Sequence, residues 1–131
     1  MTTVDSSRHA LDDALTLTGA GDRLTGRTTA AYANMVGPFG GITAATVVRA
    51  IEQHPDVLGE PVSLTANFVG PIAAGEFAVY LRIVRTNRTT QHWYVELSQD
   101  DSVTTTATAV FALRRPTWSA TELEYPDVPA A

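Results

Sequence analysis

The chain has 131 residues, of which 44% are hydrophobic and 18% charged, and its formal net charge is −5. This is enough for one globular domain with a hydrophobic core, and the acidic balance leaves no basic patch that would attract nucleic acid. All nine basic residues are arginine and cysteine is absent, which excludes a Schiff-base lysine, a thiolate nucleophile and a thiolate metal site. With no signal-peptide core and no apolar run of about 20 residues, a soluble cytoplasmic protein without membrane contact is expected.

The first forty residues carry weak signals. Residues 1–6 are expected to be irregular, and residues 7–17 have the spacing of a short amphipathic helix. Gly19 and Gly21 are expected to break this helix. Residues 23–30 then indicate a weak strand, and residues 32–39 a loop.

The stretch from 37 to 53, GPFGGITAATVVRAIEQ, predicts the long helix of the chain. Ala44, Val47, Val48 and Ile51 are spaced as a helical stripe, wide enough to predict burial on most of the circumference. Thr43, Thr46, Arg49 and Gln53 are expected to form a narrow polar strip. The helix should end at His54, because a residue that precedes proline disfavours the helical region.

Four alternating patterns of β-branched and aromatic residues follow, at 61–69, 76–85, 91–98 and 103–113. Period-2 alternation separated by short polar turns predicts an antiparallel meander. One helix and four strands together predict an α+β domain in which an antiparallel sheet wraps around one long helix. From Arg115 the chain has three prolines and no periodicity, so residues 1–115 are expected to form one domain and 116–131 an extended tail or the start of a linker.

The segments FGGITAATVVRAI, PVSLTANFVGP, FAVYLRIVRTNRTTQHWYVELSQDDSV and TATAVFAL resemble the acyl-CoA thioesterase II family. The resemblance covers about residues 8–115 and is to the N-terminal of the two hotdog units found in that family. It implies a hotdog fold and a fatty-acyl-CoA or related acyl thioester as ligand. It also implies hydrolysis by water without a covalent intermediate, a metal or another cofactor.

In that family an aspartate, a hydroxyl residue and a glutamine of the C-terminal unit hold the attacking water. The matching positions here fall on or near Ser63, near Thr86 and near Ala109, so only the hydroxyl is kept. The alternative to an active hydrolase is therefore a non-catalytic hotdog module that forms the structural half of a thioesterase or binds acyl groups. A hydratase is disfavoured, because the sequence has no aspartate–histidine pair in a hydratase motif.

The glycines at the start of the helix are the first candidate site. Backbone N–H groups of Gly40 and Gly41, beside Phe39, could polarise a thioester carbonyl with the help of the helix dipole. The alternative is that small residues only let the loop turn and the helix pack.

The other candidates are polar side chains on the strands and turns. Thr86, Asn67 and His92 are candidates for positioning water. Ser63 and Arg88 are candidates for binding substrate, the latter with Arg82 and Arg85 near the phosphates of coenzyme A. Each also fits a solvated sheet face or an ordinary turn. His9 and His54 are expected to be exposed, and the three histidines have no metal-ligand spacing.

A single hotdog unit leaves one edge of its sheet exposed and half of its acyl tunnel unbuilt. Because an exposed edge readily pairs with another strand, we expect a homodimer with a continuous sheet or pairing with a second hotdog unit.

Overall fold

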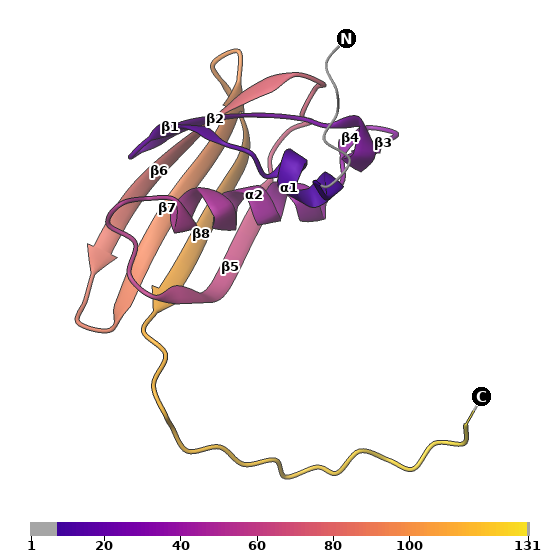
Figure 1. The fold of residues 1–131 in the computed structure, drawn as a ribbon, viewed down its shortest axis with the longest axis vertical. Coiled ribbons are helices and arrows are strands. Elements are labelled where there is room, and N and C mark those ends of the chain that lie inside the picture. The colour runs from indigo at the N-terminus through magenta and orange to yellow at the C-terminus, as the bar shows by residue number, and fades with distance from the viewer. Residues whose placement is uncertain (1–7, 131) are drawn as a thin grey trace.

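The computed structural model describes residues 8–130, which form a six-stranded antiparallel sheet with one long helix packed on its inner face (Figure 1). The strand order is β1-β2-β6-β7-β8-β5. The four long strands are β5 (Glu60–Phe68), β6 (Glu76–Thr86), β7 (Thr90–Gln99) and β8 (Ser102–Ala112). Each boundary lies within one residue of the sequence prediction, because strict alternation and polar turns mark both ends of these strands.

The N-terminal segment is more structured than predicted. Helix α1 is only Ala10–Ala14, and strands β1 (Thr18–Ala20) and β2 (Arg23–Arg27) form a hairpin that adds to the sheet beside β6. Gly19 and Gly21, expected only as breaks, have φ angles of 110° and 62°, which suit glycine in a tight turn. The predicted loop contains a 3₁₀ turn, η1 (Ala30–Tyr32), and a small pair of strands, β3 (Ala33–Asn34) and β4 (Gly37–Pro38).

Helix α2 (Gly40–Glu52) lies across the inner face of the sheet. Its buried face differs from the predicted stripe: Thr43 and Thr46 are buried, whereas Ala44 and Val48 are half-buried. Burial of Thr46 is tolerated because its hydroxyl donates to the Ile42 carbonyl at 2.8 Å. Two members of the predicted polar strip, Thr43 and Thr46, therefore face the core, and Arg49 is half-buried.

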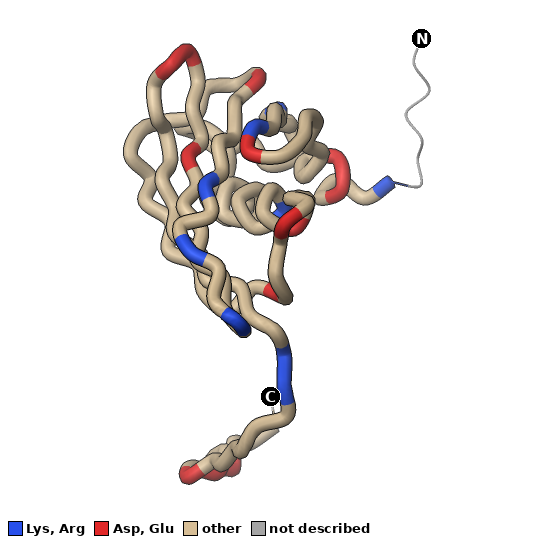
Figure 2. Tube along the Cα trace, turned by 90° about the vertical axis from the view of Figure 1, so that its left-hand side faces the viewer, with Lys and Arg blue, Asp and Glu red and all other residues tan. Residues whose placement is uncertain are grey.

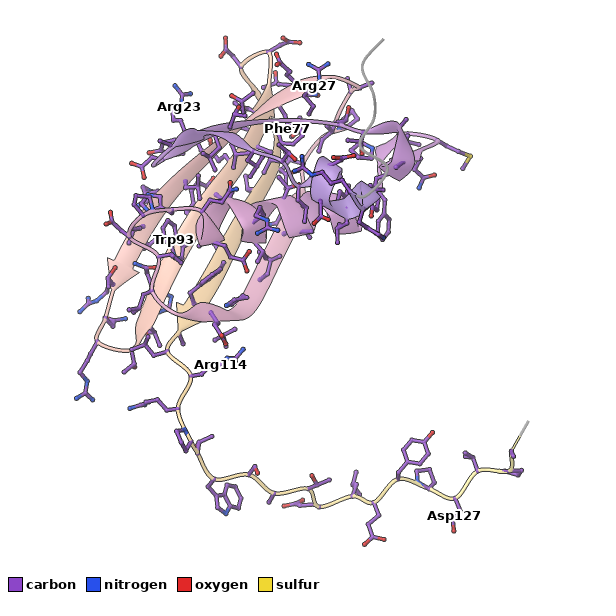
Figure 3. All side chains as sticks on the ribbon, in the orientation of Figure 1. Arg23, Arg27, Phe77, Trp93, Arg114 and Asp127 are labelled. Atoms are coloured by element: carbon purple, nitrogen blue, oxygen red, sulfur yellow. The ribbon has the colours of Figure 1, made fainter. Side chains whose placement is uncertain are left out.

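The core lies between α2 and the inward side chains of the central strands. Its largest fully buried side chain is Trp93 on β7, which lies under the end of α2 (Figure 3). Its strand members are Leu24, Phe77, Val79, Leu81, Trp93, Val95, Leu97, Ala107, Ala109 and Phe111. These positions alternate along each strand as predicted, so the antiparallel sheet around one helix is confirmed.

His54, expected to be exposed, is buried at the C-terminal end of α2. Its Nδ1 accepts the N–H of Asp56 at 3.1 Å, so the proton lies on Nε2, which donates to the Asp22 carboxylate at 2.9 Å. The ring meets the Trp93 ring edge-on, with 5.0 Å between centroids. These contacts clamp the end of α2 to the β1–β2 turn, which explains why a histidine is tolerated in the interior.

The two edges of the sheet differ. Strand β1 has three residues, whereas β5 presents nine residues with no neighbour on its outer side. Val62 and Phe68 on β5 are exposed, so this edge is long and partly apolar. After β8, residues 113–130 contain no helix or strand, and the chain leaves the end of the sheet and runs away from the domain (Figure 1). Acidic residues gather in this tail (Figure 2). Neither α1 nor α2 is long and apolar enough to cross a membrane.

Two valines on strand β6 test where the core lies. Val79 is completely buried and Val84 is 52% exposed. We expect Val79→Ala to lower the free energy of unfolding by about 2 kcal/mol, because two buried methyl groups are lost and a cavity remains. Val84→Ala, the same change on the same strand, should alter it by less than about 0.5 kcal/mol. Urea titration measures both, and equal effects would contradict the assigned orientation of β6.

Candidate functional site

The start of α2 presents two free backbone donors. Phe39 occupies the N-cap position, its side chain makes no capping hydrogen bond, and its carbonyl accepts the N–H of Ile42 at 3.0 Å. Within residues 8–130, no hydrogen-bond acceptor lies against the N–H groups of Gly40 or Gly41. These groups lie at the positive end of the helix dipole, which favours a partially negative oxygen. The arrangement can therefore bind a carbonyl oxygen or an anion.

An apolar groove lies beside these donors. It has a volume of about 280 Å³ and runs beside Gly40 between Val36, Pro38, Phe68, Pro71 and Ile72. No charged side chain lines it. We call it the glycine groove. A Cβ on Gly40 would come within 3.0 Å of the Phe68 ring, so glycine lets this exposed phenylalanine approach the helix start.

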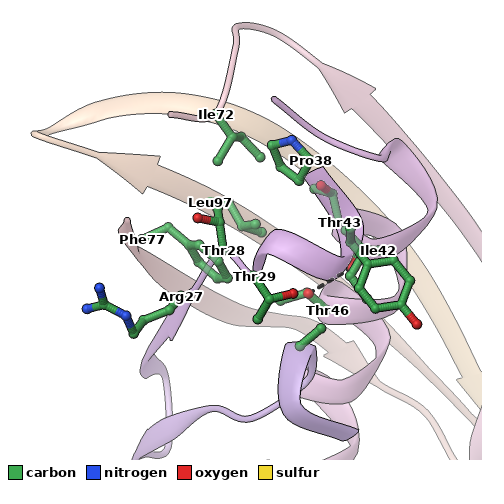
Figure 4. A pocket seen from close by; sticks show the side chains of 12 residues that line it. Arg27, Thr28, Thr29, Pro38, Ile42, Thr43, Thr46, Ile72, Phe77 and Leu97 are labelled. Carbon is green, nitrogen blue, oxygen red and sulfur yellow. Dashed lines mark hydrogen bonds between the residues drawn. The ribbon is translucent and has the colours of Figure 1, made fainter. Parts of the chain in front are cut away.

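A second cavity lies deeper, between α2 and the sheet (Figure 4). Its volume of about 20 Å³ is enough for about one water molecule. Ile42 and Thr46 of α2 face Phe77 and Leu97 of the sheet across it. The hydroxyl of Thr29, which also lines it, is buried without a hydrogen-bond partner among the described residues. This cavity is too small for an acyl chain. The glycine groove is the candidate ligand site because Gly40, with its free N–H group, lines it.

Thr86 lies at the other end of α2. Its hydroxyl accepts a hydrogen bond of 2.9 Å from Nε2 of Gln91, whose side chain is fully buried. The same Nε2 donates to the Asp56 carbonyl, and Oε1 accepts from the N–H of Leu58 and the indole N–H of Trp93. Every polar group of the Gln91 side chain is thus satisfied. Thr86 completes a network that joins the loop after α2 to strands β6 and β7.

The remaining water-positioning candidates lie on the outer face of the sheet, away from α2. His92 is exposed between the buried Gln91 and Trp93, and strand pairing places it in one row with Arg85, Val110 and Ser63. Ser63 is two strands from His92, about 10 Å away. Asn67 lies farther along β5, where its amide donates to the Thr106 hydroxyl at 3.5 Å.

The arginine candidates also lie away from the glycine groove. Arg88 is exposed in the β6–β7 turn, and Nε of Arg85 donates to the Asn87 side chain at 2.8 Å. Arg82 lies over the Tyr94 ring on the outer face, 5.5 Å from its centroid. The Tyr94 hydroxyl donates to the Glu96 carboxylate at 2.9 Å, and this bond raises the pKa of Tyr94.

The candidates therefore divide into three places. Phe39, Gly40 and Gly41 lie together at the start of α2. Thr86 and Arg88 lie toward its far end, about 20 Å away for a helix of 13 residues. The outer-face candidates are Ser63, Asn67 and His92. Ala109, at the position matched to the family's glutamine, is buried in the core. Within one copy of the chain, no candidate for holding water contacts the glycine donors.

The sequence did not indicate two features at the two ends of α2. Phe68 and Ile72 form part of the glycine groove. In the sequence they lie on either side of Gly70 and Pro71, and only the fold brings them to α2. The buried His54–Asp22 contact joins residues far apart in the sequence. Between residues 8 and 130, no group of three or more histidine, aspartate or glutamate side chains could hold a metal ion.

Comparison with known proteins identifies the family to which the chain is similar. Residues 29–112 match the family model of the acyl-CoA thioesterase N-terminal domain. No curated protein sequence matches the chain. A hotdog-fold protein of unknown function from Alicyclobacillus acidocaldarius is 51% identical, with a TM-score of 0.87, over 94% of this chain and 47% of its own.

Two further solved structures, both under 25% identical, share the fold. The acyl-CoA thioesterase II TesB2 from Mycobacterium marinum is 18% identical, with a TM-score of 0.75, over 93% of this chain and 45% of its own. A conserved protein from Pseudomonas aeruginosa, also 18% identical, has a TM-score of 0.65 over 85% of this chain and 98% of its own. The chain thus spans about half the length of the Alicyclobacillus and Mycobacterium proteins and nearly the full length of the Pseudomonas one.

The hotdog fold expected from the resemblance is confirmed by these structures and by the sheet that surrounds α2. The family match covers well over half of the chain. The chain belongs to the acyl-CoA thioesterase family, in which it matches the N-terminal hotdog domain.

Proposed function

We propose that this chain binds a fatty-acyl-CoA or related acyl thioester at the start of α2. The observation that carries the proposal is the pair of unpartnered N–H groups of Gly40 and Gly41 beside an apolar groove. In such a complex the thioester oxygen accepts hydrogen bonds from these donors. The acyl chain lies in the glycine groove against Phe68 and Ile72, with Phe39 at its mouth.

We propose hydrolysis by direct attack of water, with no covalent intermediate. The chain has no cysteine. Among the described residues that line the glycine groove, Thr43 has the single hydroxyl and no histidine is present to activate it. Charge that develops on the thioester oxygen in the transition state would be stabilised by the two N–H groups, where one such donor contributes about 3–4 kcal/mol in enzymes. Thr86, Asn67 and His92, the candidates for holding water, lie away from the groove in one copy, so this mechanism requires water-holding groups supplied by a second unit.

A second hotdog unit would approach the groove through strand β5. Antiparallel pairing of two β5 edges about a two-fold axis sets the Phe68 end of one strand beside the Glu60 end of the other. The start of α2 in one unit would then lie near the beginning of β5 in its partner. A homodimer or a pair with another hotdog unit meets this requirement equally. The cytoplasmic location expected from the sequence remains a prediction.

The alternative function is a non-catalytic hotdog module that binds acyl groups or forms the structural half of a thioesterase. It is favoured by Ser63 and Ala109 at the positions matched to the family's aspartate and glutamine. It is favoured also by Thr86, whose hydroxyl already completes the Gln91 network. The two functions share the glycine donors and differ only in turnover.

Gly41 offers a matched test of the donors. Gly41→Pro removes one N–H, whereas Gly41→Ala keeps it, and both add a Cβ that displaces the exposed Phe39 ring. We expect turnover of acyl-CoA to be about 10²–10³-fold lower in the proline variant than in the alanine variant. Because the chain has no cysteine, a thiol reagent reports released coenzyme A without background. Turnover that is equal in the two variants would rule out this donor. If wild-type protein shows no turnover but binds a non-hydrolysable acyl-CoA analogue, with binding weaker in the proline variant, the module function stands.

Two substitutions of Thr86 distinguish a structural role of this residue from a catalytic role. Thr86→Val leaves one N–H of the buried Gln91 amide without an acceptor, so we expect the free energy of unfolding to fall by about 1–3 kcal/mol. Thr86→Ser, which keeps the hydroxyl, should lower the free energy of unfolding much less. Urea unfolding measures stability, and the coenzyme A release assay is run well below the unfolding transition. A valine variant of wild-type stability that had lost turnover would assign Thr86 to water positioning instead.

A further inference from the structure

The glycine groove has an exposed rim and a buried floor. Val36 and Phe68 belong to the rim and are 81% and 60% exposed. Thr43 and Ile72 belong to the floor and are 4% and 8% exposed. An acyl chain whose carbonyl oxygen accepts the N–H of Gly40 buries its methylene groups by extending towards this floor, because the rim is open to water. Ile72 therefore lies where the acyl chain would end.

Ile72 separates the glycine groove from the small cavity between α2 and the sheet, which we call the inner cavity (Figure 4). Ile72, Pro38 and Thr43 line both spaces. Beyond them the inner cavity continues to Phe77 and Leu97 of the sheet. Pro38 is held by its ring and Thr43 by the helix, so the branched Ile72 side chain is the removable part of the wall between the two spaces.

The loop that carries Ile72 is held by hydrogen bonds on both sides. Oε1 of Gln99 accepts the N–H of Ala73 at 2.8 Å, and Nε2 of Gln99 donates to the Ala73 carbonyl at 2.8 Å. The N–H of Gly75 donates to the Thr28 hydroxyl at 2.8 Å, and the N–H of Thr28 donates to the Gly75 carbonyl at 2.9 Å. The wall is thus in place before a ligand arrives, which length selection requires.

Strand β4 lies directly on the backbone of Ile72. Gly37 has a φ of 145°, and a Cβ at this position would come within 2.8 Å of the Ile72 carbonyl oxygen, so glycine is needed for this close approach. A wider groove of about 580 Å³ shares Gly37, Pro38 and Ile72 with the glycine groove. Arg27 and Asn34 also line it. Because these polar groups would lose water to an acyl chain, the glycine groove is the better place for one.

We propose that Ile72 sets the length of the acyl group that this chain binds, by ending the glycine groove at its floor. The proposal rests on the acyl-binding site of the proposed function and adds its length selection. An apolar cavity of about 150 Å³ holds benzene, which has six carbons. The groove has a volume of about 280 Å³ and is partly open to solvent, so the limit lies at about eleven carbons or fewer.

Isothermal titration calorimetry with acyl-CoA analogues tests this limit. In these ketone analogues a methylene replaces the thioester sulfur, so binding is measured without turnover. The series runs from acetyl to hexadecanoyl, each analogue below its critical micelle concentration. For wild-type protein we expect the affinity to rise about fourfold with each methylene that is buried in the groove. The rise should stop at or before dodecanoyl, because further methylenes meet a packed wall or stay in water.

Two substitutions of Ile72 should move the limit by different amounts. Ile72→Ala removes every side-chain carbon beyond Cβ, and Ile72→Val removes the terminal methyl group. We compare the analogue two carbons beyond the wild-type limit with the analogue at the limit. The ratio of these two affinities should rise at least about tenfold in the alanine variant and about fourfold in the valine variant. The ratio does not depend on the folded fraction, since that fraction scales both affinities equally.

Leu24→Ala is the matched control. Leu24 is 5% exposed, close to the value for Ile72, and lines neither the glycine groove nor the inner cavity. This variant should keep the wild-type dependence on acyl length. If Ile72→Ala does not fold, the smaller Ile72→Val change provides the same comparison.

The outcomes separate this proposal from the proposed function. Parallel length profiles in wild type and in both Ile72 variants would overturn the role of Ile72 and leave acyl binding intact. An affinity that keeps rising to hexadecanoyl in wild type would place the acyl chain in the wider groove and also overturn it. If wild-type protein bound none of the analogues, the proposed function and the length limit would both be wrong.

Discussion

The packing of α2 against the inner face of the sheet is the contact on which the structure depends. Val47, Ala50 and Ile51 of the helix are completely buried against the central strands. At the C-terminal end, the helix is held by His54, which bonds to Asp22 and contacts Trp93. The Gln91 network joins the following loop to the same strands. Because the end of the helix is tied by side chains, its start can remain open without loss of the fold.

The uncapped start of α2 affects both the stability of the helix and the proposed binding of a ligand. A side-chain cap at position 39 would satisfy the first N–H groups of the helix and stabilise it by about 1 kcal/mol. Here Phe39 provides no such bond, and Gly40 and Gly41 leave the donors uncovered beside an apolar groove. The same glycines also let Phe68 pack closely. The structural and the ligand-binding explanations of these residues are therefore compatible, since one local geometry serves both.

One copy of the chain contains only half of the arrangement that thioester hydrolysis needs. The donors lie at one end of α2, Thr86 at the other, and His92 and Asn67 on the opposite face of the sheet. The exposed β5 edge is the side from which a second unit would approach the groove. A partner that pairs with β5 would supply the missing water-holding groups and would also cover the exposed strand edge.

The sequence by itself determined the long helix, the four long strands and the domain they build, because apolar periodicity and turn residues act locally. The resemblance of about residues 8–115 to the acyl-CoA thioesterase II family correctly indicated the family and the hotdog fold. Tertiary structure decided what depends on residues distant in the chain: the face that α2 buries, the burial of His54 against Asp22, and the use of Thr86 by Gln91. It also decided that the candidate residues lie in three separate places. Strand order and register set these distances, and neither is encoded in a local pattern.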